Sequence, residues 1–447
     1  MVPVRVLIPS GALGLGFDAD AFEAGLARNP DIIAIDGGST DSGPYYLGTG
    51  SAKYSHNSIK REWQILMEAR ERLGVPLLIG TAGTCGSKTA VDQLVDITQQ
   101  IASQLGHKLK LAILYSDQNP SDLSVDQLTA LEPQIEVSQE IVNDCTNIVA
   151  LAGAEQIQSA LDTGADIVIA GRATDTAVIS ALPLARGCDP GASWHGAKIG
   201  ECGALATTNP TSGTILIEFD KDGFVVEPMA ADARATPRTV SAHMLYENSD
   251  PFVLYEPGGH LDVREANYEQ LDARRVRVTG SKWVPNPVYT VKLEGARQAG
   301  FQTTSMVMVR DERYVRNIED WLKGLRAYCE PLITTAPGQT YDLEFRLIGQ
   351  NATLGELENK SGLPVEIGVL CIVTATTQEL ATEIAKLLNP QLLHMPLTAD
   401  EPLPTFAFPY SPAETERGPL YEFCLNHVME LSDPMQAFEL KVLEIRP

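Results

Sequence analysis

The sequence is poor in positive charge and has no long apolar run. Of its 447 residues, 34 are Lys or Arg and 58 are Asp or Glu, so the formal net charge is −24. This balance argues against a nucleic-acid partner and against an anionic membrane surface, because both need clustered basic side chains. No apolar stretch approaches the ~18–20 residues of a membrane-spanning helix. A small anionic substrate is not excluded, since a few local Arg or Lys side chains can form one positive pocket.

Metal and cofactor motifs are also missing. The seven Cys residues include no CxxC pair, and no Cys and His stand at zinc-finger spacing. The segment up to Ser10 lacks a signal-peptide pattern, so we expect a reduced, cytoplasmic protein. Gly11–Gly16 fails the spacing of a dinucleotide loop and is interpreted as a tight turn, with a modified phosphate- or CoA-binding loop as the alternative. We therefore expect no cofactor and metal-free chemistry, with an occasional Mg²⁺ on Asp36 and Asp41 as the exception.

The first 190 residues alternate short apolar runs with amphipathic helical segments. The runs are Val4–Pro9, Asp31–Ile35, Val75–Ile79, Lys110–Tyr115 and Ala165–Ala170. Continuous apolar runs are typical of parallel strands buried on both faces. Right-handed crossovers then place helices on both sides of the sheet. We expect a doubly wound α/β domain with a mostly parallel sheet over residues 1–190.

Beyond residue 190 the pattern changes to strand-like pieces with fewer helical segments. We expect an α+β region over residues 191–335 that completes the site, and a small two-layer α+β domain over residues 336–447. This division agrees with ~100–200 residues per domain. Because soluble metabolic enzymes are commonly symmetric homo-oligomers, we expect one here.

The predicted strands end in loops rich in Gly, Ser, Thr and Asp. In an open parallel sheet, ligands bind beyond the carboxyl ends of the strands. The loop after the second strand offers Asp36 as an acid. It also supplies four candidate substrate contacts, which are Gly38, Ser39, Thr40 and Tyr45. The alternative is a long surface loop with a structural role only.

The loop after the third strand contains Thr81, Thr84 and Cys85 close to a helix start. A thiol at such a place is expected to have a lowered pKa and to be nucleophilic. No His can be assigned as its base, and the alternative is a small residue in a tight anion-binding turn.

The loop after the fifth strand contains Arg172, Thr174 and Asp175. Arg is the residue type suited to bidentate capture of a carboxylate, so Arg172 is the predicted substrate anchor. Asp175 is a general base, the cap of the next helix or the ion-pair partner of Arg172.

Two further acid–base candidates lie outside these loops. Glu201 stands in a nearly uncharged stretch and is expected to be buried with a raised pKa. His260 lies in a Gly-rich turn with acids on both sides. A plain exposed turn is the alternative for His260.

Six stretches of the chain carry a family resemblance. They are Asn29–Gly48, Ala165–Asp175, Ile199–Ala204, Ser241–Glu247, Tyr289–Ala296 and Phe406–Pro412. In these stretches the chain resembles the acyclic terpene utilisation protein A-like family. The family takes its name from a pathway that degrades branched acyl-CoA compounds. The resemblance implies a lyase step on a 3-hydroxy-glutaryl-type thioester or a related acid, and it carries over no catalytic residue.

The sequence as a whole predicts a cytoplasmic lyase, either a hydro-lyase (hydratase) or a carbon–carbon lyase. Its substrate would be a small hydroxy or unsaturated carboxylate or the CoA thioester of one. Arg172, with Ser39 and Thr40, would hold the carboxylate, and a strand-end acid would move the proton beside the carbonyl. Backbone N–H groups near Thr81 and Cys85 would stabilise the enolate oxygen.

Two other functions remain open at this point. One is a non-catalytic or partner-dependent binding subunit that needs a small partner protein to form its site. The other is a hydrolase that uses Cys85 as its nucleophile.

Overall fold

The computed structural model describes residues 2–446, and the chain forms two compact units. The first unit comprises the chain up to Arg297 together with the chain from Phe423 onward, and the second comprises Gln298–Glu422. Two long strands, β15 (Tyr289–Val309) and β18 (Glu414–Leu431), each continue from one unit into the other. Within residues 2–446, no helix combines the length and the apolarity needed to cross a bilayer.

The first unit is built on a ten-stranded sheet with a parallel centre. The five central strands lie in the order β1 (Val4–Ile8), β2 (Ile32–Asp36), β3 (Leu77–Gly80), β7 (Ile167–Ala170) and β4 (Leu109–Tyr115). Antiparallel strands extend both edges. They are β8 (Ile215–Phe219), β9 (Gly223–Pro228), β13 (Val276–Thr279) and β12 (Asn267–Gln270) beyond β1, and β19 (Glu439–Ile445) beyond β4.

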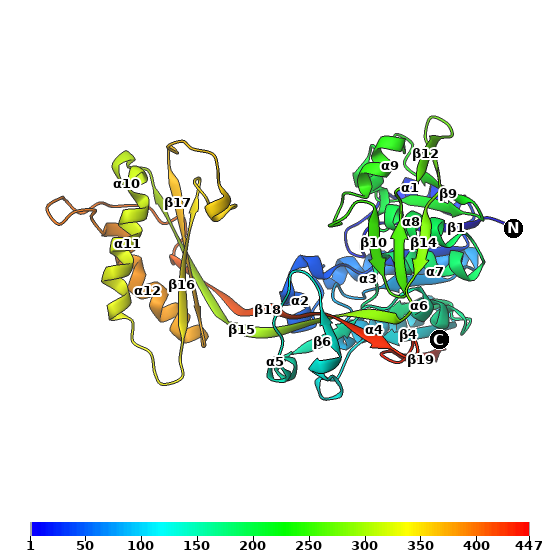
Figure 1. Ribbon diagram of the computed structural model, residues 1–447, viewed down its shortest axis with the longest axis horizontal. Coiled ribbons are helices and arrows are strands. Elements are labelled where there is room, and N and C mark those ends of the chain that lie inside the picture. The colour runs from blue at the N-terminus through cyan, green and yellow to red at the C-terminus, as the bar shows by residue number, and fades with distance from the viewer. Residues whose placement is uncertain (1, 447) are drawn as a thin grey trace. The chain divides into compact units, whose positions relative to one another are not determined.

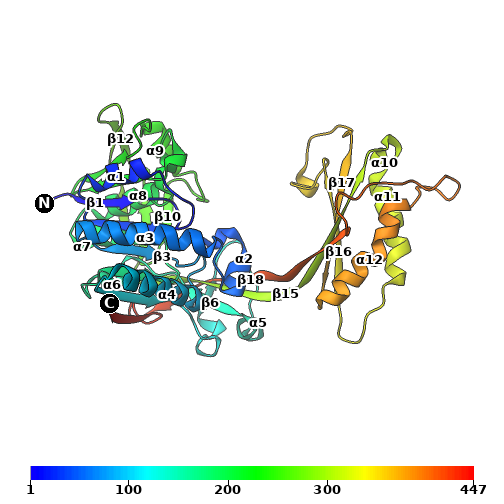
Figure 2. The same cartoon turned by 180° about the vertical axis from the view of Figure 1, so that it is seen from behind.

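Helices cover both faces of this sheet, as Figure 1 and the reverse view in Figure 2 show. Leu7 and Ile33 point to the face covered by α1 (Ala19–Leu26), α3 (His56–Leu73) and α4 (Lys88–Leu105). Val6 and Ala34 point to the face covered by α6 (Ala154–Leu161), α7 (Asp175–Ala185) and α8 (Pro190–Gly200). Because both faces are buried, the strands are apolar throughout. The doubly wound α/β prediction is confirmed.

The direction in which strands are added to the sheet reverses after β4. From β1 to β4 the chain moves one way, with α1, α3 and α4 on one face, and β7 then returns to a position between β3 and β4. Because crossovers are right-handed, this return places α6 on the opposite face, and α7, which follows β7, packs on the same face as α6. The loops that follow β3 and β7 therefore lead to opposite faces. Open α/β sheets bind their ligands at such a reversal.

Shorter elements complete the first unit. β6 (Asn147–Ala150) pairs with β15, and β5 (Leu128–Ala130) pairs with β18. A separate three-stranded sheet is formed by β10 (Val253–Glu256), β11 (Gly259–Asp262) and β14 (Lys282–Pro285). The remaining helices are α2 (Pro44–Thr49), α5 (Gln139–Asp144) and α9 (Pro237–His243).

The second unit has two layers. Its strands lie in the order β16 (Tyr341–Ile348), β17 (Ile367–Ala375), β15 and β18. The helices are α10 (Glu312–Arg316), α11 (Ile318–Cys329) and α12 (Gln378–His394), and the succession is the β-α-β-β-α-β of ferredoxin-like folds. Trp321, Leu325 and Leu388 of the helices share one buried cluster with strand residues such as Val369. The predicted fold class, a small two-layer α+β domain, is thus confirmed; the unit comprises Gln298–Glu422, whereas the prediction gave residues 336–447.

Candidate functional site

A cleft of about 650 Å³ lies at the carboxyl ends of the parallel strands in the first unit. Its walls include the carboxylates of Asp36, Asp41, Asp175 and Glu247 and the ammonium group of Lys53. Asp36 is buried and Asp175 is partly buried, whereas the other three side chains are exposed. The cleft is therefore acidic, with two carboxyl groups at its base.

Arg172 follows β7 and forms a buried network next to this cleft. Its Nε donates to Glu294 Oε2 at 3.0 Å, and its Nη2 and Nη1 donate to the hydroxyls of Thr40 and Thr81, both at 3.2 Å. Asp175 Oδ1 lies 3.7 Å from Nη1. All three guanidinium nitrogens are thus engaged by protein groups.

The charge of Arg172 is balanced mainly by Glu294. Burial lowers the pKa of Arg172, but Glu294 and Asp175 raise that pKa above its ordinary value. Burial raises the pKa of Glu294, yet Arg172 and Lys292 together bring it down to about 2. Lys292 Nζ donates to the second oxygen of Glu294 at 2.8 Å. Arg172 and Glu294 are therefore a fully ionised buried pair at neutral pH.

Asp36 is the last residue of β2 and has one free carboxyl oxygen. Its Oδ2 accepts a hydrogen bond from the Gly38 N–H at 2.9 Å, while its buried Oδ1 has no partner. Burial, and then the charge of Asp175, raise the pKa of Asp36 well above its ordinary value, although Arg172 opposes the shift. Asp36 therefore keeps its proton to a higher pH than an ordinary Asp does.

Asp175 begins α7, directly after the capping residue Thr174, whose hydroxyl accepts from the Ala177 N–H. Burial raises the pKa of Asp175 to about 6, and the charges of Arg172 and Lys198 limit the shift. At neutral pH Asp175 is therefore mostly ionised. The two carboxyl groups at the base of the cleft differ in their readiness to hold a proton.

Glycines allow the loops around these acids to approach closely. A Cβ on Gly86 would lie 2.1 Å from the Arg172 nitrogen, and one on Gly37 would lie 2.3 Å from the Thr81 oxygen. Thr81 and Thr84 have φ angles of 49° and 77°, in the left-handed region that disfavours side chains with a branched Cβ. Such strain is typical of functional loops.

Beside the cleft lies a second ionisable group, made up of the side chains of Lys198, Glu201, Glu256 and His243. Lys198 Nζ donates to Glu201 Oε1 at 2.5 Å. Burial raises the pKa of Glu201 to about 8 against the opposing charge of Lys198, which agrees with the burial and raised pKa predicted for Glu201. Glu256 accepts from the Thr176 hydroxyl, and burial raises its pKa to about 7. Burial and Lys198 lower the pKa of His243 to about 4.

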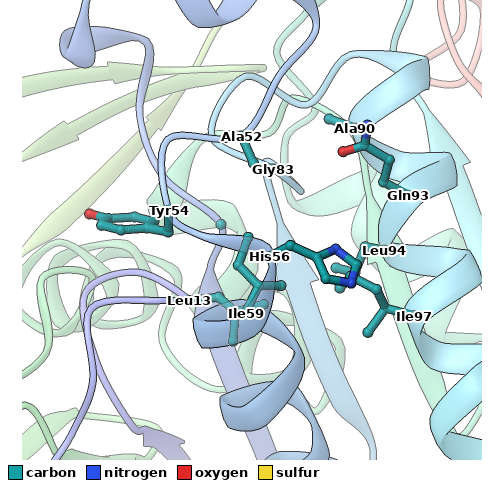
Figure 3. Close-up of a pocket in the computed structure, with 11 residues that line it drawn as sticks. Leu13, Ala52, Tyr54, His56, Ile59, Gly83, Ala90, Gln93, Leu94 and Ile97 are labelled. Atoms are coloured by element: carbon teal, nitrogen blue, oxygen red, sulfur yellow. The ribbon is translucent and has the colours of Figure 1, made fainter.

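A second pocket, of about 370 Å³, has mainly apolar walls. Leu13, Ile59, Leu94 and Ile97 contribute to it, and Tyr54 lines both this pocket and the cleft. Figure 3 shows the aliphatic side chains grouped around the His56 ring, with the Tyr54 ring turned away from them. The pocket and the cleft are therefore neighbours that share one aromatic residue.

The structure distributes most of the predicted site residues over four places. Asp36, Gly38, Ser39, Thr84 and Asp175 line the cleft. Thr40, Thr81 and Arg172 form the network beside it, Thr174 caps α7, and Glu201 belongs to the second ionisable group.

Three further predicted residues belong to none of these places. Cys85 is fully buried, and burial raises the pKa of its thiol, opposite to the lowered pKa expected near a helix start. Tyr45 lies exposed on α2, with its ring 5.6 Å from that of Tyr46. His260 lies on β11, with its ring 5.5 Å from that of Tyr255.

Sequence reasoning missed several charged residues that the structure brings to the site. They are Lys53, Lys198, Glu247, Glu256 and Glu294. One local signal existed for Glu294, because Lys292 and Glu294 alternate with apolar residues and so share one face of a strand. Another existed for Lys198, which is three residues from Glu201, a spacing that places two side chains on one helix face.

Comparison with known proteins places the chain in one family. The family model described as acyclic terpene utilisation family protein AtuA matches residues 51–187 and 190–407, which together make up most of the chain. The matched segments include Arg172, Asp175 and Glu294 but not Asp36. No curated protein and no solved structure gives a significant match. The family description indicates a role in a metabolic pathway, and the chain is a member of the acyclic terpene utilisation (AtuA) family.

Proposed function

We propose that this protein is a lyase that transfers a proton next to the carbonyl group of a hydroxyacyl or unsaturated acyl thioester. The observation that carries this proposal is the pair of acids at the base of the cleft. Asp36 and Asp175 line the same cavity, and Asp36 Oδ1 is buried without a protein partner. Two carboxyl groups whose surroundings favour different protonation states form a general acid and a general base.

Asp175 is the base and Asp36 is the acid in this scheme. With a pKa of about 6 and Arg172 nearby, Asp175 is ionised at neutral pH and accepts the proton from the carbon beside the carbonyl. Asp36 retains its proton and delivers it to the departing hydroxyl group. In the hydro-lyase direction a C–H and a C–O bond break, a C=C bond forms and water leaves. Exchange with solvent then returns both side chains to their starting states.

The charges around the cleft favour a thioester over a free acid. Arg172, the predicted carboxylate anchor, is already paired with Glu294, and Lys53 lines the cleft together with four acidic side chains. At its reacting end a free acid would place another negative charge among these acids, whereas the carbonyl group of a thioester is neutral there. The apolar pocket that contains Leu94 and Ile97 offers space for the carbon chain of such a substrate.

Hydrogen–deuterium exchange at carbon tests this proposal even when the product is unidentified. The full chain is incubated in D₂O with a panel of short and branched 3-hydroxyacyl-CoA thioesters and the matching free acids. Mass spectrometry then measures deuterium at the carbon beside the carbonyl. We expect exchange with thioesters, and a rate at least ~100-fold lower in Asp175→Asn, which is the lower range for loss of a general base.

The matched control is Asp96→Asn, which changes an exposed carboxylate on α4 and should leave the exchange rate unchanged. Exchange that proceeds only with free acids would reassign the substrate class. An Asp175→Asn protein with the rate of the unmodified chain would refute the assignment of the base. Absence of exchange and of product across the panel would refute the lyase.

A further inference from the structure

Three side chains with metal-binding donor atoms meet beside the cleft. Glu201 and Cys202 directly follow α8, and His243 is the last residue of α9. A carboxylate oxygen, the Cys202 sulfur and an imidazole nitrogen lie within 4.8 Å of one another. Glu201 and His243 are buried, whereas Cys202 is partly exposed and lines the cleft. The trio is thus closed on the protein side and open on the cleft side.

A second observation at this place concerns the hydrogen bonds of His243. Its side chain is only 5% exposed, and its buried Nε2 atom has no hydrogen-bond partner. Buried polar atoms in native proteins almost always have a partner, so each exception calls for an explanation. A ligand bound between His243, Glu201 and Cys202 would supply the missing contact.

The charges around the trio also favour a cation. Lys198 is the ammonium group beside Glu201, and the carboxyl groups of Asp175 and Glu256 lie close enough to act on Glu201 electrostatically. Glu256 has a buried oxygen of its own without a partner. Three carboxyl groups and a thiol therefore lie within electrostatic reach of one ammonium group.

We propose that Glu201, Cys202 and His243 bind one divalent cation of the zinc type, with its fourth position open to the cleft. Thiolate, imidazole and carboxylate are the ligands that Zn²⁺ takes, and three protein ligands with one open position are typical of catalytic zinc sites. Mg²⁺ prefers oxygen ligands only, so the thiol makes it a poor occupant. The donors need to draw in by about 1 Å to reach the ~3.5 Å separations that follow from zinc bond lengths in a tetrahedron.

Lys198 does not have to leave when the cation binds. Its ammonium group contacts Oε1 of Glu201, and a carboxylate has a second oxygen that is able to coordinate a metal. Binding removes the proton from the Cys202 thiol, because only the thiolate is a ligand. This inference is independent of the proposed lyase chemistry, since a metal site here stands or falls on binding alone.

Cobalt substitution tests the site. The purified full chain is treated with a chelator and a reductant, and Co²⁺ is then added while the absorption spectrum is recorded. We expect one Co²⁺ per chain and a near-ultraviolet charge-transfer band from a thiolate ligand, and Zn²⁺ should displace the Co²⁺. Cys202→Ser should lose the band, and His243→Ala should bind Co²⁺ at least tenfold more weakly.

The control must distinguish this trio from a pair of closely spaced thiols elsewhere in the first unit. The sulfur atoms of Cys145 and Cys424 lie 2.8 Å apart in a different core of the same unit, so Cys145→Ser should keep both band and affinity. Thermal unfolding of each metal-free variant shows that it is folded before titration. Failure of the unmodified chain to bind Co²⁺ and Zn²⁺, or a band that survives in Cys202→Ser, would overturn the proposal.

Discussion

The two units differ in what they bury. The second unit, Gln298–Glu422, packs its helices on its sheet through apolar side chains, and its buried polar residues are the hydroxyls Thr303 and Ser305. The first unit has apolar cores on both faces of its sheet, but it also buries ionisable side chains near the strand ends. They are Asp36, Arg172, Lys198, Glu201, Glu256 and Glu294. Because burying charge costs free energy, such a concentration indicates function rather than stability.

The largest expected effect is on folding of the first unit and comes from Arg172→Ala. This change leaves Glu294 buried without its guanidinium partner, and breaking a buried ion pair in this way costs about 3–5 kcal/mol. Urea unfolding measures the difference. The matched control is Arg346→Ala in the second unit, where an exposed Arg pairs with Glu344 and no measurable change is expected. Equal stabilities of the two variants would contradict the contrast between the units.

A core substitution should act on the second unit alone. Leu325 is fully buried on α11, so Leu325→Ala should lower the stability of this unit by about 2–5 kcal/mol. Amide hydrogen exchange should then rise in β16 and β17 and stay unchanged in β1 to β3. Leu354→Ala, at an exposed position, should change stability by no more than about 0.5 kcal/mol. Faster exchange in β1 to β3 would show that the units do not unfold separately.

The smallest effect, measured over one pH unit, is a difference in pH dependence between the two carboxylates beside Arg172. The pKa of Glu294 is about 2 in the folded protein, below its ordinary value of 4.5, because Arg172 and Lys292 favour the ionised form. Its stabilising contribution is therefore present above pH 4.5 and is lost as the pH falls toward 2. The pKa of Asp175 is about 6, above its ordinary value of 3.8, because burial disfavours the charged form. Its contribution to the free energy of unfolding is therefore present below pH 3.8 and is lost as the pH rises through 6.

Unfolding free energies measured between pH 2 and pH 7 test these opposite signs. Asp175→Asn should remove a loss of stability between about pH 4 and 6, and Glu294→Gln should remove a loss below about pH 4.5. For each group, the free energy of unfolding changes by at most about 1.4 kcal/mol per pH unit. Profiles of the two variants that differ from the unmodified chain in the same pH range would contradict the assignment.

Much of the first unit was predictable because its signals are local. Ile32–Asp36 and Ile167–Ala170 are short apolar runs, and such runs indicate buried parallel strands wherever they occur. Once the strands are parallel, their carboxyl ends share one edge, which brings Asp36 and Asp175 to one cleft.

Cys85 shows where local reasoning fails. Its position near a helix start suggested an activated thiol, but the protein packs around it, and burial raises its pKa instead. Arg172 shows the same limit for a charge. Its sequence context suggested a free anion anchor, whereas its partner Glu294 comes from a strand 122 residues further along the chain.

By itself the sequence determined the parallel α/β framework, the polar loops at the strand ends and the acids of those loops, because each depends on periodicity and residue type within a short segment. Only the tertiary structure decided which charges meet. His243 of α9 meets Lys198 and Glu201 at the end of α8, and Glu294 reaches Arg172 across the fold. Protonation states depend on that gathering, because burial and neighbouring charge set a pKa and neither is a property of a local segment.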